Sequence, residues 1–131
     1  MLAQLKQGLV GHAALVVAEE HTAPRVGSGK VHVLATPVMI NLIEAAALSA
    51  IEHLLPSGHQ SLGTLLNVRH TAATPVGMRV SATAEVIAVE GRLVRFHVEA
   101  RDEKEQIGDG THERVVVNVA KFDERVRRKL N

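Results

Sequence analysis

The chain of 131 residues has the size of one domain and can bury its own hydrophobic core. Hydrophobic residues make up 46% and charged residues 22% of it, which excludes a wholly disordered chain. The net charge of +1 and the scarcity of aromatic residues argue against a nucleic-acid-binding surface, and the absence of cysteine excludes disulfides and thiolate catalysis.

Three further features of the sequence concern cellular location, metal binding and membrane insertion. Residues 1–10 lack the apolar segment of a signal peptide, so we expect a cytoplasmic protein. The eight histidines show no His-Glu-x-x-His spacing or comparable close pair, and we expect no metal site. The most apolar stretch, residues 33–55, is interrupted by Asn41, Glu44 and Glu52, which argues against a membrane span.

The N-terminal part of the chain predicts a strand, a loop and an extended segment. Residues 9–18 are apolar and rich in valine, which is typical of a strand. Residues 21–30 contain Pro24, Gly27 and Gly29 and indicate a mobile loop. Residues 31–34 then lead in an extended conformation into the next element.

A long helix is predicted to follow. Thr36 suits the N-cap and Pro37 the first helical position. The helix is expected to end near Leu55, ahead of Pro56. Apolar residues cover most of its circumference, which predicts a helix that is buried on most sides.

The second half of the chain predicts an antiparallel meander. Apolar and polar residues alternate over residues 78–88 and 94–101, the pattern of half-buried strands joined by a hairpin at Glu90-Gly91. The glycines within residues 108–110 indicate a bulge or kink, and a short helix is expected after Phe122. The predicted strands of this half are residues 62–71, 78–88, 94–101 and 114–120.

These elements together predict an α+β fold in one domain, residues 1–131, with a curved antiparallel sheet wrapped around a long central helix. A single sheet around one helix leaves strand edges open. Pairing of edges between two copies would close them, so we expect a homodimer, while a tetramer stays possible.

Two polar residues in apolar surroundings are candidates for a functional site. Glu44 lies on one helical arc with Asn41, Ser49, Glu52 and other polar residues, and this arc is either a solvent-exposed stripe or the wall of a pocket. A histidine at the end of a predicted strand, His70, is by itself either structural or catalytic.

The sequence resembles a known family at several motifs. These are Ala35-Thr36-Pro37-Val38-Met39 leading to Glu44-Ala45-Ala46, Gly63-Thr64, and Asn67-Val68-Arg69-His70-Thr71 continuing to Met78. Over residues 9–120 the chain is similar to the hot-dog-fold thioesterases of the fluoroacetyl-CoA thioesterase type. The spacing of threonine, glutamate and histidine agrees with that family.

The resemblance implies a hot-dog fold, a homodimer with active sites at its interface, and hydrolysis of an acyl-CoA thioester without a cofactor. The catalytic threonine, glutamate and histidine of the family correspond to Thr36, Glu44 and His70. Its backbone-binding glycine corresponds to Gly63, and its arginine near the last strand corresponds to Arg114.

The chemistry of thioester hydrolysis assigns a role to each group. Glu44 can act as general base or as nucleophile, and the sequence leaves both open. His70 suits proton transfer near neutral pH. The Thr36 hydroxyl and the Gly63 N–H can donate hydrogen bonds to the carbonyl oxygen. Arg114 is expected to bind the phosphates of coenzyme A, ahead of Arg69 and Arg79.

Helix geometry sets a condition on this site. Glu44 lies eight residues beyond Thr36, roughly 12 Å along the helix axis, so the two cannot bond directly. Either the entry loop folds back over the helix, or the site is assembled across the two-fold axis of a dimer.

The sequence also bears on the acyl group of the substrate and on two functions other than thioester hydrolysis. The fluoroacetyl-specialised member of the family has aromatic lid residues before the threonine, whereas residues 23–33 contain none, so a general short acyl-CoA is expected. A non-catalytic acyl-CoA sensing domain would keep the pocket without needing Glu44. An enoyl-CoA hydratase would require an acid close to His70.

Overall fold

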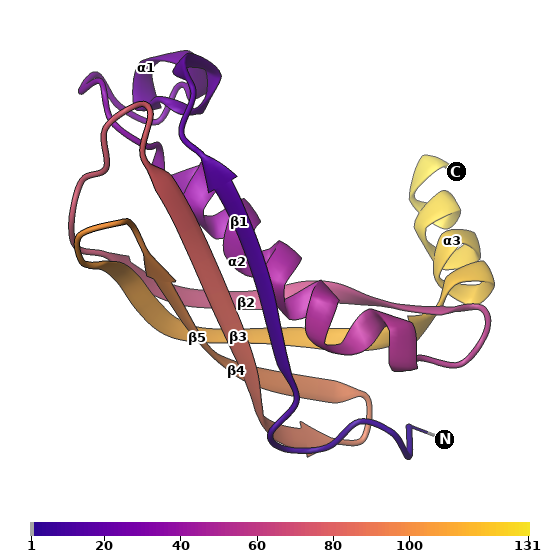
Figure 1. Ribbon diagram of the computed structural model, residues 1–131. Helices are drawn as coiled ribbons and strands as arrows, with labels where there is room; N and C mark the ends of the chain where they lie inside the picture. The colour runs from indigo at the N-terminus through magenta and orange to yellow at the C-terminus, as the bar shows by residue number, and fades with distance from the viewer. Residues whose placement is uncertain (1) are drawn as a thin grey trace.

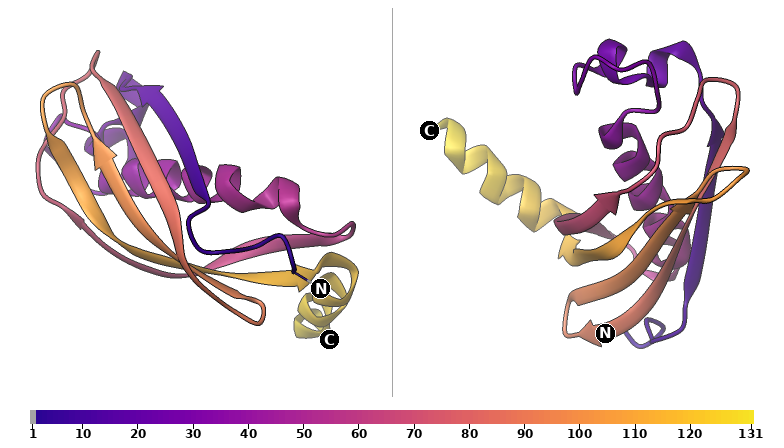
Figure 2. Two further views of the ribbon diagram at one scale, coloured as in Figure 1. Left: turned by 60° about the horizontal axis from the view of Figure 1, so that its bottom comes forward. Right: turned by 90° about the vertical axis from the view of Figure 1, so that its left-hand side faces the viewer.

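The computed structural model describes residues 2–131 and has the α+β architecture expected from the sequence. Five antiparallel strands form one curved sheet in the order β1-β3-β4-β5-β2, and the long helix α2 crosses its concave face (Figures 1 and 2). The strands are β1 (Val10–Val16), β2 (His59–His70), β3 (Arg79–Glu90), β4 (Leu93–Arg101) and β5 (Gln106–Asn118); the helices are α1 (Ala23–Val26), α2 (Thr36–Ile51) and α3 (Val119–Arg127).

The core lies between α2 and the sheet. The inward positions of β3 and β4 alternate as predicted, and their side chains are buried against the helix. Small residues allow a close approach: a Cβ at Gly11 on β1 would collide with the backbone of Ala46 on α2. The fully buried residues include Met39, Ile43, Ala46, Ala47 and Ile51 of the helix and Val80, Val86, Val94, Phe96 and Val98 of the sheet.

The helix is less enclosed within one protomer than its sequence predicts. Asn41, Ala45 and Ser49 are exposed, and the Ser49 hydroxyl accepts a hydrogen bond from the backbone N–H of His12 at the edge of the sheet. The α-helix ends at Ile51, before its predicted end near Leu55, and continues as a 3₁₀ turn over Glu52–Leu54. The stretch Thr36–Leu54 is long and apolar enough to cross a membrane by length and composition alone, yet here it is the core helix of the fold.

Thr36 does not cap the helix. Ala35 occupies the N-cap position without a side-chain cap, Thr36 is the first helical residue, and Pro37 follows in the first turn. The predicted cap is therefore wrong by one residue, because the Thr36 hydroxyl is directed to His70 and not to the free backbone N–H groups of the helix.

The last strand continues through the glycines near residue 108, and the predicted bulge lies directly before them: Gln106 pairs with Arg101 and Gly108 with Ala100, so Ile107 is the extra residue. β5 begins at Gln106, eight residues before its predicted start, and passes through both Gly108 and Gly110. A Cβ at Gly108 would lie 2.7 Å from the carbonyl oxygen of Arg69 and 2.8 Å from the sulfur of Met39. The glycines thus mark the close contact of β5 with β2 and with the helix.

The segment predicted as a loop between β1 and α2 contains two short turns of helix. A 3₁₀ turn covers Glu19–His21, and α1 follows it and ends at Gly27, whose φ of +91° is a conformation that favours glycine. An isolated bridge between Thr22 and Leu34 closes the segment into a compact cap over the start of α2.

Candidate active site

Thr36 and His70 meet at one end of the molecule, where α2 begins and β2 ends. Their Oγ1 and Nδ1 atoms lie 2.7 Å apart and share a hydrogen bond. Both side chains line a cavity of about 300 Å³, whose remaining walls are mainly small or apolar: Ala23, Val33, Leu34, Thr71, Ala72 and Ala73. The cavity therefore pairs a hydroxyl with an imidazole beside an apolar surface.

The imidazole of His70 is arranged for proton transfer. Burial lowers its pKa, and a weaker interaction with the backbone of Ala72 offsets this in part, so the ring is neutral at neutral pH. Its Nε2 atom is buried and has no hydrogen-bond partner within residues 2–131. A buried polar atom without a partner is costly in an unliganded protein, which makes Nε2 a candidate contact for substrate or water.

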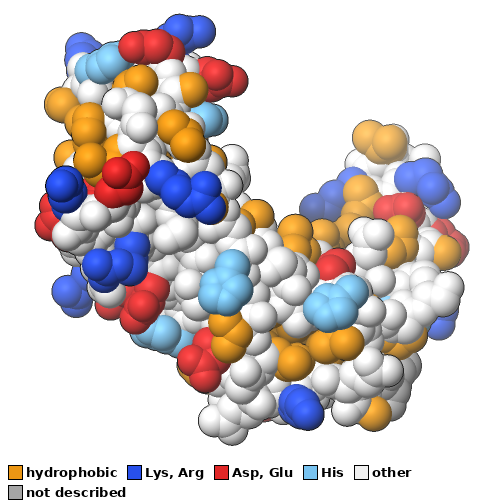
Figure 3. Space-filling model, viewed as in Figure 1, with side chains coloured by type: hydrophobic (Ala, Val, Ile, Leu, Met, Phe, Trp, Pro, Cys, Tyr) orange, Lys and Arg blue, Asp and Glu red, His pale blue; other side chains and the backbone are white. Residues whose placement is uncertain are grey.

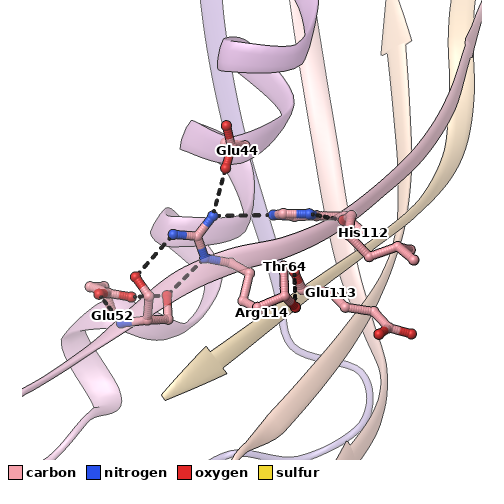
Figure 4. Close-up of polar contacts among 8 residues, drawn as sticks. Glu44, Glu52, Thr64, His112, Glu113 and Arg114 are labelled. Atoms are coloured by element: carbon pink, nitrogen blue, oxygen red, sulfur yellow. Dashed lines mark hydrogen bonds and ion pairs between the residues drawn. The ribbon is translucent and has the colours of Figure 1, made fainter. Parts of the chain in front are cut away.

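Glu44 belongs to a second polar group, midway along α2 (Figure 4). Its Oε2 accepts a hydrogen bond of 3.2 Å from Nη1 of Arg114, which projects inward from β5. The Arg114 side chain is 6% exposed and that of Glu44 33% exposed, so the carboxylate lies where the buried ion pair reaches the surface. The permanently charged guanidinium and the carboxylate thus form an ion pair.

Arg114 is held by three neutral contacts besides Glu44. Its Nε donates to Oγ of Ser61 at 2.8 Å and its Nη2 to the Ser61 carbonyl at 3.1 Å. Nη1 also lies 3.2 Å from Nε2 of His112, whose Nδ1 is 2.8 Å from the carbonyl oxygen of Leu65. Sequence reasoning missed Ser61 and His112, although His112 shares the inward parity of Arg114 on β5, the one signal that pointed to it.

His112 must be neutral to make these contacts. Its Nδ1–H donates to the Leu65 carbonyl, and its Nε2 accepts from Arg114. Burial, together with the nearby positive charge of Arg114, lowers the pKa of His112, although the Leu65 carbonyl and nearby carboxylates act in the opposite sense. The ring also stacks on Phe96 with 5.7 Å between centroids, which fixes its plane.

Gly63 lies directly below the carboxylate of Glu44. A Cβ at this position would be 2.6 Å from Glu44 Oε2 and 3.3 Å from the His112 ring. The pairing of β2 with β5 also shifts here, between Gly63 and Leu65, which leaves Thr64 as a bulge. The glycine therefore allows the carboxylate of Glu44 to lie close to the backbone of β2.

The expected contact of Arg114 with the phosphates of coenzyme A does not fit its placement. The guanidinium is buried, and four hydrogen bonds to Glu44, Ser61 and His112 engage it within the protein. A phosphate outside the fold cannot reach it without breaking this network. Arg69 and Arg79 are exposed, as that role would require.

The two groups do not come together within one protomer. No hydrogen bond between residues 2 and 131 joins the Thr36–His70 pair to Glu44 or Arg114. The entry segment folds over the start of α2 without reaching Glu44, in agreement with the separation expected along the helix.

No three histidine or acidic side chains of the described part of the chain lie close enough to hold a metal ion.

The two buried histidines predict how stability depends on pH. Both have a pKa in the folded protein below the value of about 6.5 of an unfolded histidine. Below that value the unfolded chain takes up protons that the folded chain refuses, so stability decreases as the pH falls. We expect the melting temperature to drop between about pH 7 and about pH 5.

Melting curves across this pH range test the expectation. Replacing the exposed His53 by Asn should leave the pH dependence intact, whereas His70→Asn should weaken it. A dependence that is the same in both variants would show that His70 contributes nothing to it.

The similarity of the chain to known proteins agrees with this geometry. The model of the family described as "Fluoroacetyl-CoA-specific thioesterase" matches residues 17–120. A fluoroacetyl-CoA thioesterase from Streptantibioticus cattleyicolor is 47% identical over 97 residues, which cover 74% of this chain and 70% of that protein.

Solved structures extend the similarity to the fold. The fluoroacetyl-CoA thioesterase FlK superposes with a TM-score of 0.90 at 38% identity, over 95% of this chain and 97% of that chain, and a variant of it has been solved with acetyl-CoA. A hot-dog-like protein from Thermanaerovibrio acidaminovorans has a TM-score of 0.89 at 24% identity, over 98% of this chain and 96% of that chain. The fold predicted from the sequence, a hot-dog fold, is thereby confirmed.

Proposed function

The chain belongs to the family of fluoroacetyl-CoA-specific thioesterases and is a thioester hydrolase, and from this premise we propose that it hydrolyses short acyl-CoA thioesters with Glu44, His70 and Thr36 as catalytic residues. The observation that carries the assignment is the Thr36–His70 hydrogen bond at the wall of an apolar cavity, with the second nitrogen of His70 buried and unpartnered.

The tautomer of His70 decides which proton the pair can move. With the proton on Nδ1, the ring donates to Thr36 Oγ1, the threonine O–H is free to donate to the carbonyl oxygen of the thioester, and Nε2 can accept a proton. With the proton on Nε2, the ring can protonate the leaving thiolate of coenzyme A. Hydrolysis needs both steps in turn.

Glu44 supplies the negative charge for attack on the carbonyl carbon. It forms an ion pair with Arg114, and the absence of a side chain at Gly63 lets the carboxylate lie close to the backbone of β2. The carboxylate either attacks the carbonyl and forms an anhydride that water then hydrolyses, or it takes a proton from a water that attacks directly. The Gly63 N–H is a second donor for the oxyanion in either route.

We further propose that the site is assembled across a homodimer formed through β2. This strand is an edge of the sheet, carries the exposed Leu62, Leu65 and Leu66, and bears both Gly63 and His70. In the view of Figure 3, hydrophobic side chains lie along the hollow between the α1 end of the molecule and α3. A two-fold axis near Leu66 would place His70 of one protomer beside Gly63 and Glu44 of its partner.

Sedimentation tests the dimer. We expect the parent protein to be dimeric at micromolar concentration, and Leu65→Lys to shift it toward monomer, because the lysine would place a charge in an apolar interface. Val16→Lys, on the exposed edge strand at the other side of the sheet, is the matched control and should stay dimeric. A monomeric parent protein, or a Leu65→Lys dimer as stable as the parent, would contradict the proposed interface.

Thr36→Ala separates catalysis from stability. Because the hydroxyl does not cap α2, its removal should leave the melting temperature nearly unchanged. Turnover should fall roughly 10²-fold, as for the loss of one oxyanion donor. A melting curve and a thiol-release assay on the same preparation measure both. A stability loss of about 1 kcal/mol, the cost of a deleted cap, would restore the capping role.

The walls of the cavity support a general short acyl substrate. Ala23, Ser28 and Val33 line it from the entry segment, and none of them is aromatic. Release of free thiol from acetyl-, fluoroacetyl-, propionyl- and butyryl-CoA tests the proposal. Turnover of the unfluorinated substrates supports it. Binding without thiol release favours a sensing domain, and hydration of an enoyl-CoA without thiol release favours a hydratase.

A further inference from the structure

We propose that Ser61 and Glu52 are positioning residues, which hold Arg114 in the orientation in which its guanidinium fixes the carboxylate of Glu44. Neither side chain touches the reacting atoms, and both act through Arg114. The inference rests on the proposed function, in which Glu44 is the reacting carboxylate, and it extends the functional site to the last turn of the central helix.

The carboxylate of Glu44 depends on a single partner. Within residues 2–131 its hydrogen bond comes from Arg114 Nη1 at 3.2 Å, and its side chain is one-third exposed. A glutamate side chain has several rotatable bonds, so one contact selects a rotamer only if the partner is itself fixed. The position of the reacting oxygen is therefore set by the position of Arg114.

Ser61 ties the guanidinium at two points. Nε donates to its Oγ and Nη2 to its backbone carbonyl, which locks one side of the planar fork onto β2 (Figure 4). On the other side, one Nη1 hydrogen is directed to Nε2 of His112. The remaining Nη1 hydrogen is left to point at Glu44.

Glu52 sets the direction of the serine hydroxyl. Its Oε1 accepts the backbone N–H of Ser61 and its Oε2 accepts the hydroxyl O–H, both at 2.8 Å. Because that hydrogen is committed to Glu52, a lone pair of the Ser61 oxygen faces Nε of Arg114, and the hydroxyl acts as an acceptor there. Hydrogen bonds in such a chain polarise one another, so the charge of Glu52 strengthens the hold on Arg114.

The arrangement links two points of one helix. Glu44 lies on α2, and Glu52 opens the 3₁₀ turn that follows it. The end of the helix that carries the reacting carboxylate thus anchors the arginine that orients this carboxylate. Ser61 and Arg114 are each 5% exposed as whole residues, so the hydrogen bonds between them are shielded from competing water.

Steady-state kinetics of three variants with acetyl-CoA test the proposal. Ser61→Ala removes the bridging hydroxyl, and we expect kcat to fall roughly 10- to 100-fold, as for a misplaced reacting group, with KM within about twofold of the parent. Glu52→Gln should lower kcat in the same direction. The double variant should be no slower than Ser61→Ala, because Glu52 acts through the hydroxyl. Ser81→Ala, an exposed serine on β3, is the matched control.

The outcomes distinguish a failure of this inference from a failure of the proposed function. A folded Ser61→Ala with parental kcat overturns the inference even if Glu44→Gln is inactive, whereas an active Glu44→Gln overturns the proposed function itself. A Ser61→Ala variant with a raised KM and unchanged kcat also overturns the inference, since that result indicates that Ser61 contacts the substrate. If Ser61→Ala fails to fold, Glu52→Gln carries the test, and parental kcat in that variant contradicts the role of the network.

Discussion

Glu44→Gln should lose nearly all turnover while remaining folded. The amide keeps the volume of the side chain and can still accept a hydrogen bond from Arg114, but it carries no negative charge for attack or for proton abstraction. We expect kcat for acetyl-CoA to fall by roughly 10²–10⁴-fold, the contribution of a positioned acid–base group. If Glu44 is a nucleophile, the loss should lie at the upper end of this range or beyond it.

Two controls accompany this variant. Glu85→Gln, an exposed glutamate on β3, removes the same charge away from the site and should keep parental kcat. A melting curve establishes that the variant is folded, because the change leaves Arg114 with neutral partners only and should reduce stability to some extent. A folded Glu44→Gln that turns over acetyl-CoA at the parental rate would show that the carboxylate is structural.

His70→Ala should lower kcat by a similar factor, at least roughly 10²-fold, because it removes the hydrogen-bond partner of the Thr36 hydroxyl and the group that moves the proton. Combined with Glu44→Gln, it should cause little further loss. Residues that act as one catalytic unit have strongly non-additive effects, since the second substitution finds little left to remove.

The double variant is the more informative part of this measurement. His97→Ala, an exposed histidine on β4, is its matched control and should be neutral. Multiplicative losses in the Glu44→Gln/His70→Ala double variant would mean that the two residues act in separate steps or at separate places. Near-parental turnover of folded His70→Ala would leave His70 a structural residue of the cavity wall.

Much of this fold is predictable because its signals are local. The alternation of apolar and polar residues on β3 and β4 comes from a sheet that is buried on one face. It is present along β4 and on β3 as far as Val86, where a register shift ends it. The central helix is equally clear from its composition. Of its exposed residues, Asn41 and Ser49 lie on the polar arc that the sequence showed, whereas Ala45 fits both a buried and an exposed position.

The local predictions fail where a residue contacts another residue that is distant in the sequence. Thr36 has the sequence context of an N-cap, but His70, 34 residues away, takes its hydroxyl. Gly108 and Gly110 indicated a bulge or kink, and a bulge is present at Ile107, but nothing local shows that β2 passes close to both glycines. Such long-range contacts override local preferences.

The candidate site was predicted in part, through the similarity of its motifs to a family. The burial of Arg114 was not predicted, and in the structure its guanidinium binds side chains of the protein itself. Glu52 and Ser61 are nine residues apart, but both lie far in the sequence from His112 and Arg114. Their grouping depends on the register between β2 and β5, which side-chain patterns alone do not determine.

The central claim is that each active site takes Thr36 and His70 from one protomer and Glu44 from its partner. Mixed dimers test it directly. Glu44→Gln and His70→Ala chains with different affinity tags are co-expressed, the mixed dimer is isolated through both tags, and thiol release from acetyl-CoA is measured. In that dimer one site would combine the intact His70 of one chain with the intact Glu44 of the other, and the second site would carry both defects.

The account predicts that the mixed dimer recovers about half of the parental turnover per dimer, although each variant alone is nearly inactive. A mixed dimer that is as inactive as the Glu44→Gln and His70→Ala homodimers would place Glu44 and His70 of one site on the same chain. It would thereby contradict the assembly of the site across the interface.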